Sequence, residues 1–318
     1  MLFYLCPVNY NFHRFLRGHA GPVYTLVQSG EPYCIYSGSS DGVVAKWDLE
    51  AGEPLPFSVK TDSPVFSVLP SGDRLLIGQH KGGIHVIDLE SKKEVRHLKY
   101  HTTGVFALAE IQNEQLILSA GGEGNLAITD SRDFRHLHTI PVSAQKLRCI
   151  VIAPGGKHAV VGGSDGFLRV FDTAYFNEVF SVKAHDGGMY SAAFLHADTL
   201  VTGGRDAHLR FWKFTPDRPV QTDAVPAYNF AVYSLSVHPD QPEVFAGGSR
   251  DKTCKVWSLT DIKRPVRLER PKDQGPVRSV NAVCFSERGK YLTAAGDDRM
   301  LTVWRAPSVE GHNGQPAS

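Results

Sequence analysis

The chain has few of the features that mark secreted, membrane-spanning or disulfide-bonded proteins. Asn-x-Ser/Thr sequons are absent, and no apolar run approaches the roughly 20 residues that a membrane helix needs. The N-terminus, MLFYLCPVNY, carries no basic segment and is too short for a signal peptide. The cysteines are odd in number and form no CxxC pair: Cys6, Cys34, Cys149, Cys254 and Cys284. We therefore expect a cytoplasmic protein in a reducing compartment, without disulfides or membrane contact.

An excess of charge of either sign is also missing. The 318 residues contain 34 Lys and Arg against 33 Asp and Glu, which leaves a formal net charge of +1. No global field then draws the protein to nucleic acid, so we do not expect nucleic acid as a partner. A local patch remains compatible with this balance. The basic, Pro-rich stretch of residues 260–276 is interpreted as a solvated loop and kept as an alternative interface.

The sequence contains no catalytic motif in the structural context that the motif requires, and no metal-binding motif. The segments GSSDG (residues 38–42) and GGSDG (162–166) fit the pattern G-x-S-x-G, but a strand-like segment follows each of them instead of the required helix. We interpret both as hairpin turns, where Gly and Asp supply the backbone geometry. The fourteen histidines are scattered and include no HExxH motif. We expect no catalytic residue, no metal and no cofactor, and hence no enzyme.

What the chain does have is one segment that recurs seven times. Its copies are VVAKWDL, GIHVIDL, NLAITDS, FLRVFDT, HLRFWKF, TCKVWSL and MLTVWRA, with the landmark residues Trp47, Ile87, Thr129, Phe171, Trp212, Trp257 and Trp304. Six residues before the landmarks stand Asp41, Lys81, Glu123, Asp165, Asp206, Asp251 and Asp298. A repeat of about 40 to 45 residues that ends in this way is typical of a four-stranded propeller blade.

A more polar fourth strand follows six of the seven repeats, and the seventh lacks one. The segment FHRFLRGH (residues 12–19) has the same pattern and precedes the first repeat. The predicted fold class is therefore all-β: a seven-bladed β-propeller of four-stranded antiparallel blades, closed by the N-terminal strand in the last blade. We expect a short extension (residues 1–10), a propeller that forms a single domain (11–306) and a disordered tail (307–318).

These repeats resemble those of the WD40-repeat (β-transducin repeat) family over nearly the whole chain. In that family a Gly-His, a Ser or Thr, the turn Asp and the Trp form a hydrogen-bonded network in each blade. Two blades match in full, the first with His19, Ser37, Asp41 and Trp47 and the fifth with His185, Thr202, Asp206 and Trp212. The resemblance implies that these residues are structural. Blades that lack members of the network are expected to rely on packing alone.

The resemblance also implies a docking surface, because propellers of this family bind partners around the narrow end of the central channel. The residue after each apolar anchor is placed there: Tyr24, Phe66, Phe106, Arg148, Tyr190, Tyr233 and Asn281. The residue before each turn position shares that face: Ser40, His80, Gly122, Ser164, Arg205, Arg250 and Asp297. Aromatic and Arg side chains concentrate binding energy at interfaces. The predicted partner-binding residues are Tyr24, Phe66, Phe106, Arg148, Tyr190, Arg205, Tyr233 and Arg250; alternatively, the rings only fill space between blades.

The function expected from these observations is a non-catalytic protein–protein interaction scaffold, monomeric outside its complex. It would bind a peptide or loop of a partner, acidic or phosphorylated, at the channel mouth. An enzyme or small-molecule binder that uses the channel is the alternative, but it needs converging acidic or metal-binding residues, and only His80 and Asp297 are of those types. A nucleic-acid binder could stack bases on the aromatic residues, but the near-zero net charge offers no electrostatic funnel.

Overall fold

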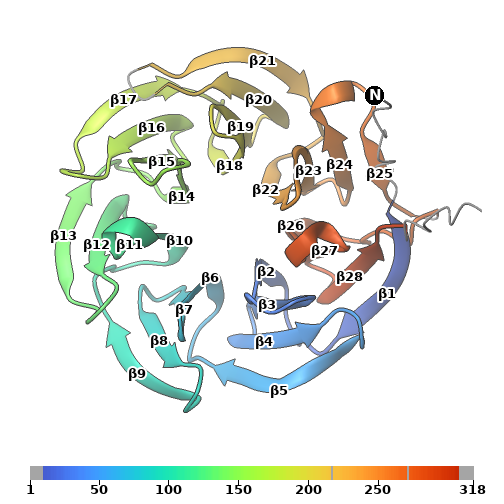
Figure 1. Ribbon diagram of the computed structural model, residues 1–318, viewed down its shortest axis with the longest axis horizontal. Helices are drawn as coiled ribbons and strands as arrows, with labels where there is room; N and C mark the ends of the chain where they lie inside the picture. Colours follow the sequence, from blue (N-terminus) through green and yellow to red (C-terminus); the bar gives the residue numbers. More distant parts are fainter. Residues whose placement is uncertain (1–9, 216–217, 271, 308–318) are drawn as a thin grey trace, which may run out of the picture.

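Short apolar segments separated by turns fold into 28 strands in the computed structural model, which describes residues 10–215, 218–270 and 272–307. The strands form seven four-stranded antiparallel sheets arranged around a central channel (Figure 1). The predicted seven-bladed propeller is therefore confirmed. Of the predicted N-terminal extension and C-terminal tail, only Tyr10 and Pro307 lie within the described residues.

The first three blades follow the chain from the centre outward. Blade 1 contains β2 (Val23–Gln28), β3 (Cys34–Ser39), β4 (Val43–Asp48) and β5 (Glu53–Lys60). Blade 2 contains β6 (Val65–Ser71), β7 (Arg74–Gln79), β8 (Ile84–Asp88) and β9 (Lys93–Leu98). Blade 3 contains β10 (Val105–Ile111), β11 (Leu116–Gly121), β12 (Asn125–Asp130) and β13 (His136–Pro141). In each blade the first strand lines the channel and the fourth lies at the rim.

The next three blades repeat this order. Blade 4 contains β14 (Leu147–Ile152), β15 (His158–Gly163), β16 (Phe167–Asp172) and β17 (Glu178–Lys183). Blade 5 contains β18 (Met189–His196), β19 (Thr199–Gly204), β20 (His208–Lys213) and β21 (Val220–Pro226). Blade 6 contains β22 (Val232–His238), β23 (Gln241–Ser249), β24 (Cys254–Ser258) and β25 (Val266–Leu268). The predicted fourth strands are thus all present, although β25 is short.

Blade 7 joins the two ends of the chain. It contains β26 (Val280–Phe285), β27 (Tyr291–Gly296), β28 (Met300–Arg305) and, as its outer strand, β1 (Asn11–Arg17). Strand β1 runs antiparallel to β28, from the pair Asn11–Arg305 to the pair Arg17–Met300, and Figure 1 shows the blue β1 beside the red β28. This pairing confirms the predicted closure of the ring, because β1 covers the outer edge of β28 that would otherwise be unpaired.

Apolar side chains pack between neighbouring blades rather than in one central core. One cluster joins Leu126 and Ile128 of blade 3 to Leu147 and Val161 of blade 4, and an equivalent cluster joins blades 7 and 1. The helices in the described part of the chain are three-residue turns, namely η1 (Gln112–Glu114), η2 (Leu259–Asp261) and η3 (Glu287–Gly289). None of them is long or apolar enough to cross a membrane.

Candidate functional site

The candidate site is built by a repeated irregularity at the start of each inner strand. The first residue of β2, β6, β10, β14, β18, β22 and β26 is a fully buried apolar anchor. The antiparallel register shifts across the next residue in all seven strands: Tyr24, Phe66, Phe106, Arg148, Tyr190, Tyr233 and Asn281. A bulge re-aims a side chain that would otherwise follow the pleat. Here it directs one side chain from each blade to the channel mouth.

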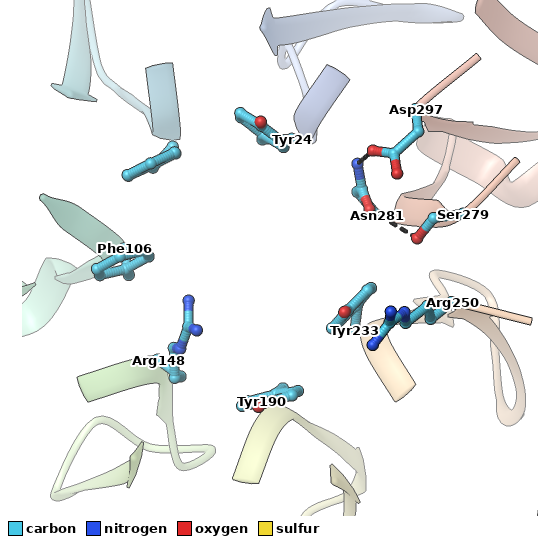
Figure 2. A pocket seen from close by; sticks show the side chains of 10 residues that line it. Tyr24, Phe106, Arg148, Tyr190, Tyr233, Arg250, Ser279, Asn281 and Asp297 are labelled. Atoms are coloured by element: carbon cyan, nitrogen blue, oxygen red, sulfur yellow. Dashed lines mark hydrogen bonds between the residues drawn. The ribbon is translucent and has the colours of Figure 1, made fainter. Parts of the chain in front are cut away.

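These seven residues line a single cavity of about 450 Å³, together with Arg250, Ser279 and Asp297 (Figure 2). Below it, a cavity of about 270 Å³ continues down the channel between side chains such as Leu26, Leu108 and Leu235. The seven residues that follow the apolar anchors in the sequence therefore all lie in one cavity. The sequence analysis missed Ser279, which stands immediately before the anchor Val280 and could have been found at that position.

Aromatic rings cover the wall from blade 1 to blade 3. The Tyr24 and Phe66 rings meet edge to face with centroids 5.4 Å apart, and Phe66 stacks on Phe106 at 4.8 Å. On the other side of blade 4, Tyr190 and Tyr233 lie 5.7 Å apart. Offset and edge-to-face contacts of this kind hold rings in fixed positions. The wall therefore offers a preformed apolar surface to a ligand.

Arg148 fills the gap between the two aromatic groups. Its guanidinium carbon lies 4.6 Å from the centroid of the Phe106 ring and 5.2 Å from that of Tyr190. Its Nε–H donates to the Ser164 hydroxyl at 3.2 Å, and no ion pair in the described part of the chain involves it. Burial lowers the pKa of the Arg148 guanidinium, because the charged form loses solvation that no carboxylate replaces. The terminal NH₂ groups are left for a ligand.

The opposite side of the mouth is polar and belongs to blade 7. Asn281 donates its amide to Asp297 at 2.8 Å and to the Val23 carbonyl at 3.1 Å, and it accepts from the Ser279 hydroxyl. Figure 2 shows Asp297 and Arg148 on opposite sides of the opening. Burial and the charge of Asp297 raise the pKa of Tyr24. The mouth therefore has a cationic side and an anionic side.

A cationic rim continues outward from the mouth over blades 6 and 7. The Arg250 guanidinium lies 5.8 Å from the ring of Phe230, which is 55% exposed. Two further hollows, of about 580 and 400 Å³, share Arg278, Val277 and Asp297. Their lining includes the exposed cations Arg250, Lys252, Arg278 and Arg299. No ion pair among the described residues engages these four side chains.

Not every residue expected at the mouth lines the cavity. Arg205 is exposed near the β19–β20 turn and does not reach the lining, and neither do Ser40, His80, Gly122 and Ser164. His80 instead contacts the edge of Phe66 at 5.5 Å between ring centroids. Asp297 is the one carboxylate among the lining residues that the structure describes, and it faces no histidine or cysteine there.

The residues of the predicted network meet in blades 1 and 5. In blade 1, the Trp47 indole N–H donates to the Ser37 hydroxyl at 2.7 Å, which lies 2.7 Å from His19 Nε2. His19 Nδ1 is 3.1 Å from Asp41. Blade 5 repeats these contacts with Trp212, Thr202, His185 and Asp206, at 2.8 to 3.0 Å. Burial lowers the pKa of both His19 and His185.

The expectation that incomplete blades rely on packing alone is wrong for blades 3, 4 and 6. In blade 3, His101 lies 2.7 Å from the Ser119 hydroxyl and 2.5 Å from the Glu123 carboxylate. In blade 4, Asp165 accepts from the Arg169 guanidinium at 2.6 Å and from the Ser143 hydroxyl at 2.7 Å. In blade 6, Tyr228 occupies the histidine position, accepts from the Trp257 indole at 3.3 Å and donates to the Gly247 carbonyl at 2.7 Å. Buried polar groups need partners, and different side chains supply them here. Tyr228 could have been found by its place in the repeat.

Fold and site together define a seven-bladed propeller with a ligand-sized cavity at one end of its channel. The family model for the WD domain, G-beta repeat, matches residues 10–48, 134–172, 176–213, 219–258 and 272–305. Because these matches cover more than half of the chain, the protein belongs to the WD40-repeat family. Four of the five matches begin at an outer strand (β1, β13, β17 or β21), so there the sequence repeat is offset by one strand from the blade.

Individual relatives are distant. The chain is 24% identical to THO complex subunit 3 of Arabidopsis thaliana over 67% of this chain and 65% of that protein. It is 24% identical to WD repeat-containing protein 1 of Gallus gallus over 89% of this chain and 46% of that protein. It is 22% identical to striatin of Rattus norvegicus, over 91% and 34%. The chain thus spans less than two thirds of the length of each of these relatives.

Proposed function

We propose that this protein is a non-catalytic interaction module that binds an acidic peptide or loop of a partner protein at the channel mouth. One observation carries the proposal: Arg148 is held between two rings at the cavity wall without a carboxylate partner. A guanidinium pairs bidentately with a carboxylate or phosphate, and such anions are recognised by arginine in peptide-binding domains. A ligand anion would therefore compensate a charge that the protein itself leaves uncompensated.

The remaining wall suits the rest of such a ligand. The stacked rings of Phe66 and Phe106 offer a fixed apolar surface beside Arg148, where an aliphatic or aromatic side chain of the peptide would pack. Asp297 lies across the opening and would repel the anion, so the acidic group is directed to the Arg148 side. The cationic rim formed by Arg250, Lys252, Arg278 and Arg299 would steer an acidic partner to the mouth.

Two further features support this assignment. The relatives include a protein named as a subunit of a complex, THO complex subunit 3, which fits an interaction role. The cysteines within the described residues, Cys34, Cys149, Cys254 and Cys284, are buried free thiols, which is compatible with the cytoplasmic location that we propose. We further propose that the protein is monomeric outside its complex and that neither a membrane nor nucleic acid is its partner.

Peptide selection followed by calorimetry tests the proposal. A random peptide library displayed on phage is selected against the full chain, and the enriched peptides are titrated into wild type and variants. We expect enrichment of Asp or Glu next to an apolar residue, and Arg148→Gln to weaken binding at least tenfold because the guanidinium contact is lost. Phe66→Ala with Phe106→Ala should abolish binding while the thermal midpoint stays nearly unchanged.

Arg205→Gln is the matched control, since Arg205 is an exposed arginine on the same face that does not line the cavity. It should bind the selected peptides within twofold of wild type at physiological salt. Enrichment of peptides without acidic residues, or equal affinity of the selected peptides for wild type and Arg148→Gln, would refute the role of the mouth as an anion-binding site.

A further inference from the structure

Outside the channel mouth, blade 2 carries a cluster of metal-ligating side chains on its two outer strands. His85 lies on β8, and Glu94 and His97 lie on β9. One donor atom from each residue lies within 4.8 Å of the other two. No metal-binding motif marks these three residues in the sequence, because they become neighbours only through strand pairing.

A β-bulge places all three side chains on one face of the sheet. His85 and His97 are directly paired across β8 and β9, and the register then shifts so that Ile87 pairs with Glu94. In a regular ladder Val95 would oppose Ile87, and Glu94 would point to the other face. The extra residue instead turns Glu94 to the side of His85, whose Nδ1 lies 3.0 Å from the Glu94 carboxylate.

One donor–donor distance is close to that of a zinc site, and the others lie within 4.8 Å. A tetrahedral zinc with ligand bonds near 2.0 Å holds its donors about 3.3 Å apart, and the His85–Glu94 pair already meets this spacing. The His97 ring stacks on His85 with centroids 4.2 Å apart and planes 18° apart, so the lone pairs of the two rings lie in nearly parallel planes. His97 is exposed, and a turn of its side chain would make its lone pair converge with the other donors.

The nitrogen of His85 that lies next to Glu94 is Nδ1, and it is the donor atom of the cluster. His85 Nε2, on the other side of the ring, is buried and has no hydrogen-bond partner among the described residues, and it takes no part in the cluster. The charged groups around the cluster include Asp62, which pairs with Lys81 at 3.1 Å, and Lys99.

The other blades show that this combination is not imposed by the fold. In blade 4 the same three positions hold Arg169, Ser181 and Glu178, with the arginine 3.7 Å from the glutamate. Blade 4 therefore forms an ion pair where blade 2 has two imidazoles and a carboxylate. Two histidines and one glutamate, with the fourth coordination position open to water, form a known ligand set of zinc.

We propose that His85, Glu94 and His97 form a binding site for a divalent transition metal, with zinc as the ion that the ligand set fits best. The ion would link the outermost strand of blade 2 to its neighbour from the solvent side and would keep at least one coordination position for water or an external ligand. Cu²⁺ and Ni²⁺ would compete for the same nitrogen donors.

Titration of the metal-stripped full chain with ZnCl₂ by calorimetry tests this site. We expect one saturable equivalent of Zn²⁺ and a rise in the thermal midpoint on binding, because an ion that binds only the folded state stabilises it. Titration with Co²⁺ should give the visible absorption of a low-symmetry site with nitrogen ligands. Glu94→Gln and His97→Gln should each weaken Zn²⁺ binding at least tenfold.

His136→Gln is the matched control. His136 is an exposed histidine on β13 that pairs with Thr129, in the place that Glu94 takes in blade 2, and its substitution should leave the Zn²⁺ affinity unchanged. Both ligand variants alter exposed side chains of an outer strand, and their thermal midpoints without metal verify that they fold. Absence of a one-to-one equivalent in wild type, or wild-type affinity in Glu94→Gln and His97→Gln, would overturn the proposal.

Discussion

Blade 5 and blade 2 have the same four-strand topology but are held together in different ways. Blade 5 ties its strands with the buried chain Trp212, Thr202, His185 and Asp206. In blade 2 the corresponding hydroxyl and indole positions hold Ile77 and Ile87, both buried in an apolar cluster. Because both blades form complete sheets, the network stabilises a blade without being needed to specify its fold.

The difference extends to what the two blades can carry. The family model matches the repeat of blade 5 and passes over residues 49–133, which include all of blade 2. Blade 2 carries the His85, Glu94 and His97 cluster on its outer strands. The channel mouth does not follow this division, because Tyr24 and Tyr190 reach it from the two blades with the complete network and Arg148 reaches it from a repeat that the family model matches.

The largest difference in stability between the two blades is expected when the turn carboxylate of blade 5 is removed. Asp206 is 13% exposed and accepts from Arg210 at 2.6 Å as well as lying 2.9 Å from His185. Asp206→Ala leaves a partly buried guanidinium and an imidazole without their acceptor, which should lower the free energy of unfolding by about 2–4 kcal/mol. The matched variant Lys81→Ala, at the same position of blade 2, changes a side chain that is 62% exposed. Its urea denaturation midpoint should stay near that of wild type, and equal losses in both variants would refute the distinction.

A smaller effect is expected from pH, again concentrated in blade 5. Burial lowers the pKa of His185, although Asp206 opposes the shift. Burial acts to raise the pKa of Asp206, but contacts with His185 and Arg210 outweigh it and lower that pKa. Both groups therefore bind fewer protons in the folded state than in the unfolded state, so stability rises with pH. The His185 contribution is complete above its unfolded pKa of about 6.5 and is lost as the pH falls towards its folded pKa; that of Asp206 is lost only below about 3.9.

Free energies of unfolding measured between pH 7 and pH 5, with chelator present, check this prediction. His185→Gln should flatten the pH dependence over that interval. The matched variant His97→Gln of blade 2 should flatten it less, because the exposed His97 ring loses less solvation on folding. If His97→Gln flattens the pH dependence of the free energy of unfolding more than His185→Gln does, the dominant role of His185 is contradicted.

The architecture could be derived from sequence because it depends on periodic features. The spacing of the landmark residues gave the seven blades, and the polar pattern of residues 12–19 gave the closing strand that pairs with β28. The seven inner positions were found because each follows an apolar anchor, although the sequence of a single repeat does not reveal the bulge that directs these side chains to the mouth. Position in the repeat was therefore sufficient where every blade repeats the same backbone geometry.

The rest depends on side-chain reach, which position alone does not give. Arg205 and Arg250 occupy the same position of their repeats, yet Arg250 lines the cavity while Arg205 does not reach it. The replacement of the histidine by Tyr228 in blade 6 requires knowing that a phenol hydroxyl reaches the Trp257 indole. The cluster in blade 2 depends on a register shift between β8 and β9. Each of these is a contact between strands rather than a pattern along one.

The smallest effect is expected when the family residue is restored to blade 2 by itself. Lys81→Asp recreates the turn carboxylate, but Thr61 stands where a complete network has the histidine that bonds to it, and Ile77 stands where that histidine would find its hydroxyl. The new carboxylate would cap a backbone N–H of its own turn, as Asp41 does with Val43 at 2.8 Å. It would also lose the exposed pair with Asp62 and place two like charges near each other. These opposing changes at an exposed site should nearly cancel, so the urea midpoint of Lys81→Asp should equal that of wild type within error. A clear stabilisation would mean that the carboxylate acts without its histidine, and that blade 5 owes its strength to Asp206 alone rather than to the network.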